Sequence, residues 1–278
     1  MKKHTKIACR LLFACVLTAG LISCAGGAGG DSDSGDNSST AARYELKTGS
    51  QINQIFDTLG AKNVAVRFEE TNAEPPAGAT IKYLDIKNSD VPVWFNANDN
   101  TIYYYVYEEN PGTKLILNKN SSSMFDFCKE LTTIDLNRFD TSKVKNMRFM
   151  FARCKKITAL SLGTFDTSKV TDMHQMFWGC DKLTDLNLAS FNTSKVTDMA
   201  FMFSDCTKLT TIEADESFTT NKVTNHDGMF ENCNKLQGGN GTKWESTNPA
   251  DKTYARIDKP GTPGYFTKPV LVLPVVKP

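Results

Sequence analysis

Three consecutive segments of the chain have nearly the same sequence, and their spacing limits the folds that the chain can adopt. The segments are Lys143–Ser168, Lys169–Ser194 and Lys195–Thr220, so they begin at positions 143, 169 and 195, with a constant period of 26. Five cysteines keep this period, except that the last interval is longer by one: Cys128, Cys154, Cys180, Cys206 and Cys233. A period of this length is typical of stacked repeats. The sequence therefore predicts five stacked repeats, with one residue inserted in the last interval.

Each repeat combines two patterns of apolar residues. In the middle repeat, residues 170–180 place Val, Met, Phe and Cys at the spacing of one face of a short helix. Residues 183–188 follow with leucines that alternate with polar residues, as in a strand with one buried face. The order L-x-x-L-x-L agrees with leucine-rich repeats. The predicted fold class is α/β: a leucine-rich-repeat solenoid with a short helix and a strand per repeat, preceded by an N-terminal α+β capping segment.

The chain divides into five predicted regions. Residues 1–23 carry a positive leader and an apolar run, as in the signal peptide of a lipoprotein. Residues 24–43 are rich in Gly, Ser and Asp, which predicts a flexible tether. Residues 44–117 predict an α+β cap or small domain, with a helix at residues 50–59 and strands near residues 64–68, 81–86, 91–95 and 101–107. Residues 118–244 contain the repeats, and residues 245–278 a C-terminal cap and tail.

The end of the leader predicts a lipid anchor. Leu21-Ile22-Ser23-Cys24 resembles the bacterial lipobox, in which the cysteine becomes the lipidated first residue of the mature protein. Cys24 is therefore the predicted lipidation site, with an ordinary signal peptide or an uncleaved anchor as the alternatives. Removing residues 1–23 removes four positive charges and no acidic ones, so the net charge changes from +1 to +1 − 4 = −3. A mildly acidic surface argues against a nucleic-acid partner.

Residues 94–107 contain a dense group of aromatic side chains that can be interpreted in two ways. They could form a ligand-binding platform, or they could cover the first repeat. Large aromatic side chains bury much area, so the covering role is favoured. The residues are Trp94, Phe95, Tyr103, Tyr104, Tyr105 and Tyr107.

The cysteines and histidines are the first candidates for chemistry. None of the repeat cysteines is in C-x-x-C spacing, so a zinc site would need ligands from separate repeats. Disulfides between adjacent repeats remain an alternative, but buried small side chains are favoured. His174 and His226 have no nucleophile motif, phosphate loop or ligand cluster around them, so we expect surface or cap histidines. We assign no catalytic residue, cofactor or metal, and an enzyme or metal site in residues 44–117 is the disfavoured alternative.

Three of the repeats also carry an Asp/Asn-Thr-Ser triplet. Stacked triplets could form a ladder of cation sites, because calcium binds several converging oxygen atoms. Asp, Asn and Thr side chains also hydrogen-bond nearby backbone in turns, and we favour that interpretation. The triplets are Asp140–Ser142, Asp166–Ser168 and Asn192–Ser194.

The outward positions of the predicted strands form a candidate binding face, called the strand face below. Its residues are small, polar and partly acidic, without the Trp, Tyr and Arg anchors of tight interfaces. Weak, multivalent contact with proteins or glycans is therefore expected. The strand face comprises Thr133, Asp135, Asn137, Ser161, Asp185, Asn187, Thr211, Glu213 and Asp215.

The repeat sequence resembles a known family. Met150–Met173, with its M-F-x-x-C and F-D-T-S-K-V-T-D-M phrases, is similar to the leucine-rich repeats of BspA-like bacterial surface proteins. Thr253–Asp258 and Pro263–Phe266 resemble the closing segment of that family. The resemblance implies a lipoprotein exposed on the bacterial outer membrane that acts as an adhesin for host extracellular-matrix proteins or other cells. The alternative is a structural surface-display or spacer module without a receptor of its own.

Overall fold

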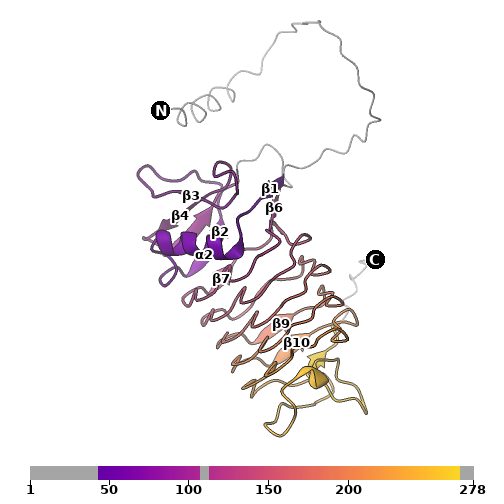
Figure 1. The fold of residues 1–278 in the computed structure, drawn as a ribbon. Helices are drawn as coiled ribbons and strands as arrows, with labels where there is room; N and C mark the ends of the chain where they lie inside the picture. Colours follow the sequence, from indigo (N-terminus) through magenta and orange to yellow (C-terminus); the bar gives the residue numbers. More distant parts are fainter. Residues whose placement is uncertain (1–42, 107–112, 270–278) are drawn as a thin grey trace, which may run out of the picture. The chain divides into compact units, whose positions relative to one another are not determined.

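The computed structural model describes residues 43–106 and 113–269, all of which belong to one compact unit (Figure 1). The predicted signal peptide, Cys24 and the tether up to residue 42 lie outside the described residues, as do Tyr107 and the tail after Pro269. Among the described residues, none of the helices has both the length and the apolar character needed to span a bilayer.

Two sheets contain the strands of the N-terminal region. In the larger sheet β2 is parallel to both β5 and β7, so the sheet continues into the first repeat. Its order is β3 (Lys82–Tyr83), β4 (Pro92–Asn96), β5 (Thr101–Tyr104), β2 (Arg67–Glu70) and β7 (Thr133–Ile134). The smaller sheet is parallel and has the order β1 (Arg43–Glu45), β6 (Lys114–Ile116) and β8 (Phe139–Asp140).

The helix α2 spans Gly49–Thr58, which confirms the helix predicted at residues 50–59. It begins with a capping box, in which the Thr48 hydroxyl accepts from the Gln51 backbone N–H and the Gln51 side chain accepts from the Thr48 N–H. It ends before Gly60, whose φ of +69° reverses the chain. Phe56 is buried on its inner face and directs the helix against the first repeat.

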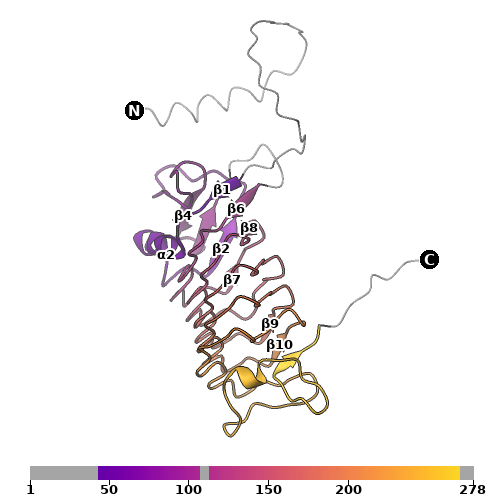
Figure 2. The ribbon, with the colours of Figure 1, turned by 45° about the vertical axis from the view of Figure 1, so that its right-hand side comes forward.

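Each repeat makes one circuit of chain, called a coil below, and successive coils stack in register. Parallel bridges join equivalent residues of all five coils, and these residues repeat the intervals of the cysteines: Asn120, Asn146, Asp172, Asp198 and Asn225. The predicted register is therefore confirmed. Figures 1 and 2 show the coils side by side between β7 and β10. A third parallel sheet has the order β11 (Phe266–Thr267), β10 (Thr211–Glu213) and β9 (Asp185–Asn187).

The prediction of a leucine-rich-repeat solenoid with a helix and a strand in each repeat is wrong. The described chain is mostly turns and short strands in three separate sheets, and α2, its single α-helix, precedes the repeats. Residues 174–179 form consecutive turns, called the turn run below as are the equivalent segments of the other coils, and residues 159–163 form no strand. The bonds of the equivalent turn run in the preceding coil alternate in direction. The N–H of Phe149 donates to His174 O of the next coil at 3.0 Å, while the N–H of Met150 donates to Met147 O of its own turn at 3.1 Å.

Left-handed backbone residues explain why the turn run is not helical. Gln175 (φ +53°) and Gly179 (φ +68°) lie close together in the turn run, and equivalent pairs recur in other coils. An α-helix needs negative φ throughout, and each left-handed non-glycine residue costs about 1–2 kcal/mol. Backbone hydrogen bonds to the next coil offset that cost. Every second N–H group of the turn run donates to a carbonyl of the neighbouring coil instead of one in its own coil. Apolar spacings of three suit both structures, so periodicity alone did not separate them.

A continuous aromatic stack runs through the core. Phe56 of α2 lies 5.9 Å from Phe125, and Tyr265 covers the other end at 5.2 Å from Phe230, measured between ring centroids. The rings of neighbouring coils are 5.4–5.8 Å apart and nearly parallel. The five stacked rings are Phe125, Phe151, Phe177, Phe203 and Phe230. No single coil could bury its own ring, so burial depends on both neighbours.

The threonines of the Asp/Asn-Thr-Ser triplets form hydrogen bonds between neighbouring coils. The Thr167 hydroxyl, which is fully buried, donates to Asn192 O at 3.0 Å and accepts from Asn192 N at 2.9 Å. Thr141 and Thr193 make the same pair of contacts to the coil that follows each of them. Asp166 accepts from the Ser168 N–H at 2.9 Å, and bonds from Ser168 are the main cause that lowers its pKa. The turn interpretation is thus confirmed for the Asp position, whereas the threonine bonds reach the neighbouring coil instead of local backbone.

The C-terminal residues cover the last coil. The short 3-10 helix η1 (Lys252–Tyr254) precedes β11, and Trp244 donates its indole N–H to Phe230 O at 2.8 Å. Asp258 is buried and accepts from the Asn240 and Thr242 N–H groups at 2.9 Å each, and from the Thr242 hydroxyl at 2.7 Å. One carboxylate therefore fixes the loop that closes the stack.

Candidate functional site

The structure brings most of the strand face together. The face residues of β9 and β10 lie in parallel register, with Thr211 beside Asp185 and Glu213 beside Asn187. Thr133 and Asn137 are exposed at the first coil, and Asp135 is half-buried between them. Ser161 is exposed in the second coil, which has no strand, and Asp215 is half-buried after β10. All nine predicted positions therefore keep some access to solvent.

Three face residues also hold the turns that follow the strands. The side-chain oxygens of Asp135, Asn187 and Asp215 accept from the N–H two residues later, at 3.0, 2.9 and 2.7 Å. Two hydrogen bonds from Ser217 lower the pKa of Asp215, and the bond from the Ser217 side chain has a larger effect than the bond from its backbone N–H. Asp215 is therefore ionised at neutral pH. The strand face therefore carries negative charge, and hydrogen bonds to the following turns fix the positions of the Asp135 and Asp215 carboxylates.

A hollow of about 280 Å³ opens on this face. Its residues come from three successive coils: Leu160, Asp185, Leu186, Asn187, Thr211 and Glu213. The outward residues of the second coil, Ala159, Ser161 and Gly163, are small and leave room above Leu160. Leu160 and Leu186, both less than a tenth exposed, provide the apolar part of the lining.

The polar lining of the hollow is partly paired. Asn187 donates to Glu213 Oε2 at 2.7 Å, and the Thr210 hydroxyl donates to Asp185 Oδ1 at 3.3 Å. Each carboxylate keeps further acceptor capacity, since it can accept several hydrogen bonds. In the described part of the chain, no group of three His, Cys, Asp or Glu residues is placed to hold a metal ion. The hollow can accept cationic or hydroxyl-rich groups over an apolar floor.

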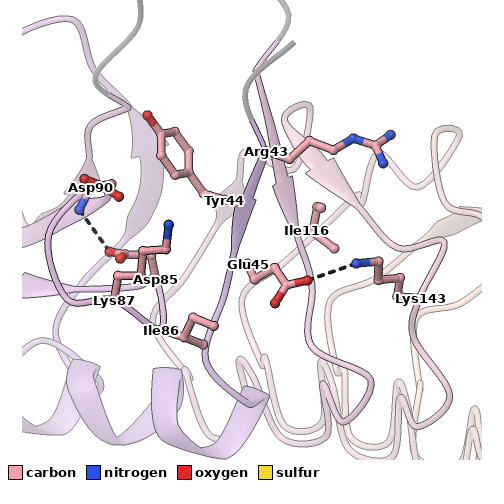
Figure 3. Close-up of a pocket in the computed structure, with 9 residues that line it drawn as sticks. All are labelled: Arg43, Tyr44, Glu45, Asp85, Ile86, Lys87, Asp90, Ile116 and Lys143. Carbon is pink, nitrogen blue, oxygen red and sulfur yellow. Dashed lines mark hydrogen bonds and ion pairs between the residues drawn. The ribbon is translucent and has the colours of Figure 1, made fainter. Parts of the chain in front are cut away.

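A second cavity, of about 350 Å³, lies beside β1 (Figure 3). It is lined by Arg43, Tyr44, Glu45, Asp85, Ile86, Lys87, Asp90, Ile116 and Lys143. Glu45 pairs with Lys143 at 3.0 Å, and this contact lowers the pKa of Glu45. The buried Asp85 carboxylate accepts from the backbone N–H groups of Asp90 and Val91 at 3.3 and 3.1 Å. These groups are committed to each other or to local backbone, so the strand face is the better candidate.

The aromatic group of the N-terminal region is divided between core and surface. Trp94 and Tyr104 are buried, and Tyr104 lies 5.0 Å from Phe68 and 5.8 Å from Phe139 of the first coil, measured between ring centroids. Phe95, Tyr103 and Tyr105 are half-buried. The covering role is therefore confirmed for Tyr104.

The five repeat cysteines are buried free thiols, as the favoured interpretation predicted. From the second coil onward, each Sγ donates to the carbonyl of a phenylalanine in the preceding coil, as Cys180 does to Phe151 O at 3.2 Å. Burial raises the pKa of Cys128 to about 12 and keeps the pKa of Cys154 and of Cys233 well above the ordinary value. Because the thiolate is the reactive form, these thiols are structural.

The two histidines occupy different environments. His174 lies between Phe149 and Phe201, with ring centroids 5.5 and 6.2 Å away, and its Nδ1 is 3.3 Å from Asp198 Oδ1. It is more buried than a surface histidine. His226 lies in the last coil with Nδ1 3.9 Å from Asp251 Oδ2, which agrees with the cap position that the sequence predicts.

Sequence reasoning missed a cluster on the turn run. The Arg153 guanidinium lies 3.4 Å from the ring centroid of Phe127 and 4.9 Å from that of Trp178. It also forms a two-pronged ion pair with Asp126 at 2.9 Å. The sequence analysis assigned no role to these residues, although an Arg and two aromatics at equivalent or adjacent repeat positions were a visible signal.

Comparisons with known proteins identify one similar family and no characterised relative. No curated protein and no solved structure matches the chain. Residues 119–244, which cover the five coils and somewhat less than half of the chain, are similar to the family described as "Mycoplasma protein of unknown function, DUF285".

Proposed function

We propose that this chain is a cell-surface binding protein, an adhesin that contacts host extracellular-matrix proteins or other cells through the strand face. The hollow between the second, third and fourth coils is the observation that supports this proposal most directly. Its carboxylates, Asp185 and Glu213, surround an apolar floor and belong to the predicted face. A shallow site of this kind suits weak contacts that gain strength when many copies act together.

The proposed location follows from the leader. We propose a BspA-like lipoprotein that is anchored to the bacterial outer membrane through lipid on Cys24 and exposed at the cell surface. The test is to replace Cys24 with Ala and to follow palmitate incorporation in the cells that produce the protein. Labelling that persists in the Cys24→Ala variant would exclude Cys24 as the lipid site.

Binding of the full chain to immobilised extracellular-matrix proteins and to intact bacterial cells tests the adhesin. Saturable binding should be lost in a variant with Asp185→Lys and Glu213→Lys. The matched control reverses two exposed acids elsewhere, Glu74→Lys and Glu245→Lys, and should bind as the wild type does. Equal loss in both variants would show a general charge effect. Absence of binding to every surface would favour the spacer module.

A further inference from the structure

Lysines recur at one corner of the stack, with one residue in each of the last four coils. Lys143, Lys169, Lys195 and Lys222 each precede a buried valine whose N–H closes a turn with the residue three positions earlier. The parallel bridges shortly after these turns keep them in register. Neighbouring lysines therefore project about 4.8 Å apart, the spacing of hydrogen-bonded strands. We call these four residues the lysine ladder.

Only one lysine of the lysine ladder makes an ion pair with a described residue. Lys143 pairs with Glu45 at 3.0 Å. Within the described residues, Lys169, Lys195 and Lys222 make no ion pair. Asp166 lies near the first two of these, but Asn192 and Thr219 occupy its position in the next coils. Three of the four ladder lysines are therefore available to an anionic ligand.

A second lysine column lies at another corner of the coils. It consists of Lys156, Lys182, Lys208 and Lys235, at the corner where each turn run meets the strand face. There Lys156 pairs with Glu130 at 2.6 Å, and the hollow with its two carboxylates lies beside this corner. Like the lysine ladder, this column has one ion-paired lysine, but it lies at a different corner of the coils. The two columns have the same number of lysines at the same spacing, and they provide a matched comparison.

Hydroxyl groups line the lysine ladder. Ser168 and Ser194 directly precede two of the lysines, and both are at least partly exposed. Thr171, Thr197 and Thr224 lie two residues after three of them and are exposed. Each of these threonine hydroxyls donates to a carbonyl of the preceding coil, at 3.1–3.3 Å, and keeps its acceptor lone pairs. A ligand with both anionic groups and hydroxyls therefore finds partners for both.

We infer that the lysine ladder binds an extended anionic polysaccharide that lies along the stack, across the coils. Four lysines span about 14 Å, three steps of the strand spacing. A nucleic acid fits less well, because aromatic side chains that would stack on bases are absent from the ladder positions. A membrane surface also fits less well, because the exposed large apolar side chains among the described residues, Val64, Ile81 and Ile86, all lie in the N-terminal region. This inference is separate from the strand-face proposal and does not depend on it.

Binding of the full chain to immobilised heparin, with dextran as the neutral control, tests the inference. The triple variant Lys169→Gln, Lys195→Gln and Lys222→Gln should bind at least about tenfold more weakly at moderate salt. Its salt dependence should also fall, because each lost lysine contact removes about 0.7–0.9 from the slope of log affinity against log salt. The matched triple variant Lys182→Gln, Lys208→Gln and Lys235→Gln removes the same charge from the other corner of the coils and should stay within about twofold of the wild type.

Two further measurements separate the alternatives. Replacement of the three ladder lysines by arginine keeps the charge and should keep the binding. Melting temperatures of all variants should match the wild type, because the replaced lysines are exposed. Equal loss in both glutamine variants, loss in the arginine variant, or no heparin binding by the wild type would overturn the inference. Tighter binding to duplex DNA or to anionic phospholipid vesicles than to heparin would also overturn it, whereas loss of strand-face binding alone would leave it intact.

Discussion

Replacement of Thr167 by valine tests whether buried hydroxyls hold the coils together. Valine has nearly the same shape, so the change removes the two hydrogen bonds to Asn192, at 3.0 and 2.9 Å, with little change in packing. A buried polar group left without a partner costs about 1–3 kcal/mol, which gives about 2–6 kcal/mol for two. Because Asn192 is half-buried, water can satisfy part of the loss. We therefore expect the lower part of that range, about 2–3 kcal/mol.

Urea denaturation followed by tryptophan fluorescence measures this cost, since the chain has three tryptophans. Two controls separate the hydroxyl from other effects. Thr167→Ser keeps the hydroxyl and should cost only about 1 kcal/mol for the lost methyl group. Thr164→Val changes an exposed threonine of the same coil and should stay within about 0.5 kcal/mol of the wild type. Amide exchange at Asn192 should speed up in Thr167→Val. A Thr167→Val variant as stable as the wild type, with unchanged amide exchange at Asn192, would refute the role of the Thr167 hydroxyl in holding the coils together.

Three other perturbations test the rest of the fold. Leu186→Ala empties a fully packed position of β9 and should lower the free energy of unfolding by about 2–5 kcal/mol, measured in urea. Gly228→Ala should cost about 1–3 kcal/mol, because φ is +57° and a Cβ would lie 2.4 Å from the Phe201 ring; a melting temperature equal to that of the wild type would contradict the left-handed turn. Burial alone would raise the pKa of Asp258, but hydrogen bonds from Thr242 and other donors outweigh it and lower the pKa. The stability that the ionised Asp258 contributes is therefore complete above its unfolded pKa of about 3.9, and it is lost as the pH falls through its lower folded pKa. Asp258→Asn should remove that part of the acid dependence, which urea midpoints at several pH values below neutrality would show.

The repeat register was readable from the sequence, and the conformation of each repeat was not. Cysteine and phenylalanine recur at fixed positions of the repeat, so the intervals between Cys128 and Cys233 determined which residues stack. Apolar spacings of three and one, however, suit either a helix or a run of turns. Gly179 and Gly228 have positive φ, and glycine at these positions was a sequence signal for turns. Phe149 and Phe201 also have positive φ, but phenylalanine rarely adopts it, so the sequence carried no signal there.

The candidate site was only partly readable for a similar reason. Alternation of leucine with polar residues located Asp185 and Glu213 on the outside, and this needed no knowledge of the rest of the coil. The recess at Leu160 arises because small side chains of one coil lie between larger ones of its neighbours. Such a shape depends on which coils stand side by side. It follows from the stacking and not from any one segment.

In-register bridging also restricts how such a chain can change in length. A duplication of one whole repeat would add a coil whose every column meets a matching neighbour, whereas any other insertion must bulge from a corner. The single extra residue of the last interval illustrates the second case. Asn187 and Glu213 keep the regular period, but Asp198 and Asn225 are one position further apart, so the bulge lies between Glu213 and Asn225. Gene variants that differ by whole units would therefore keep the fold while they changed the number of lysines presented along the corner.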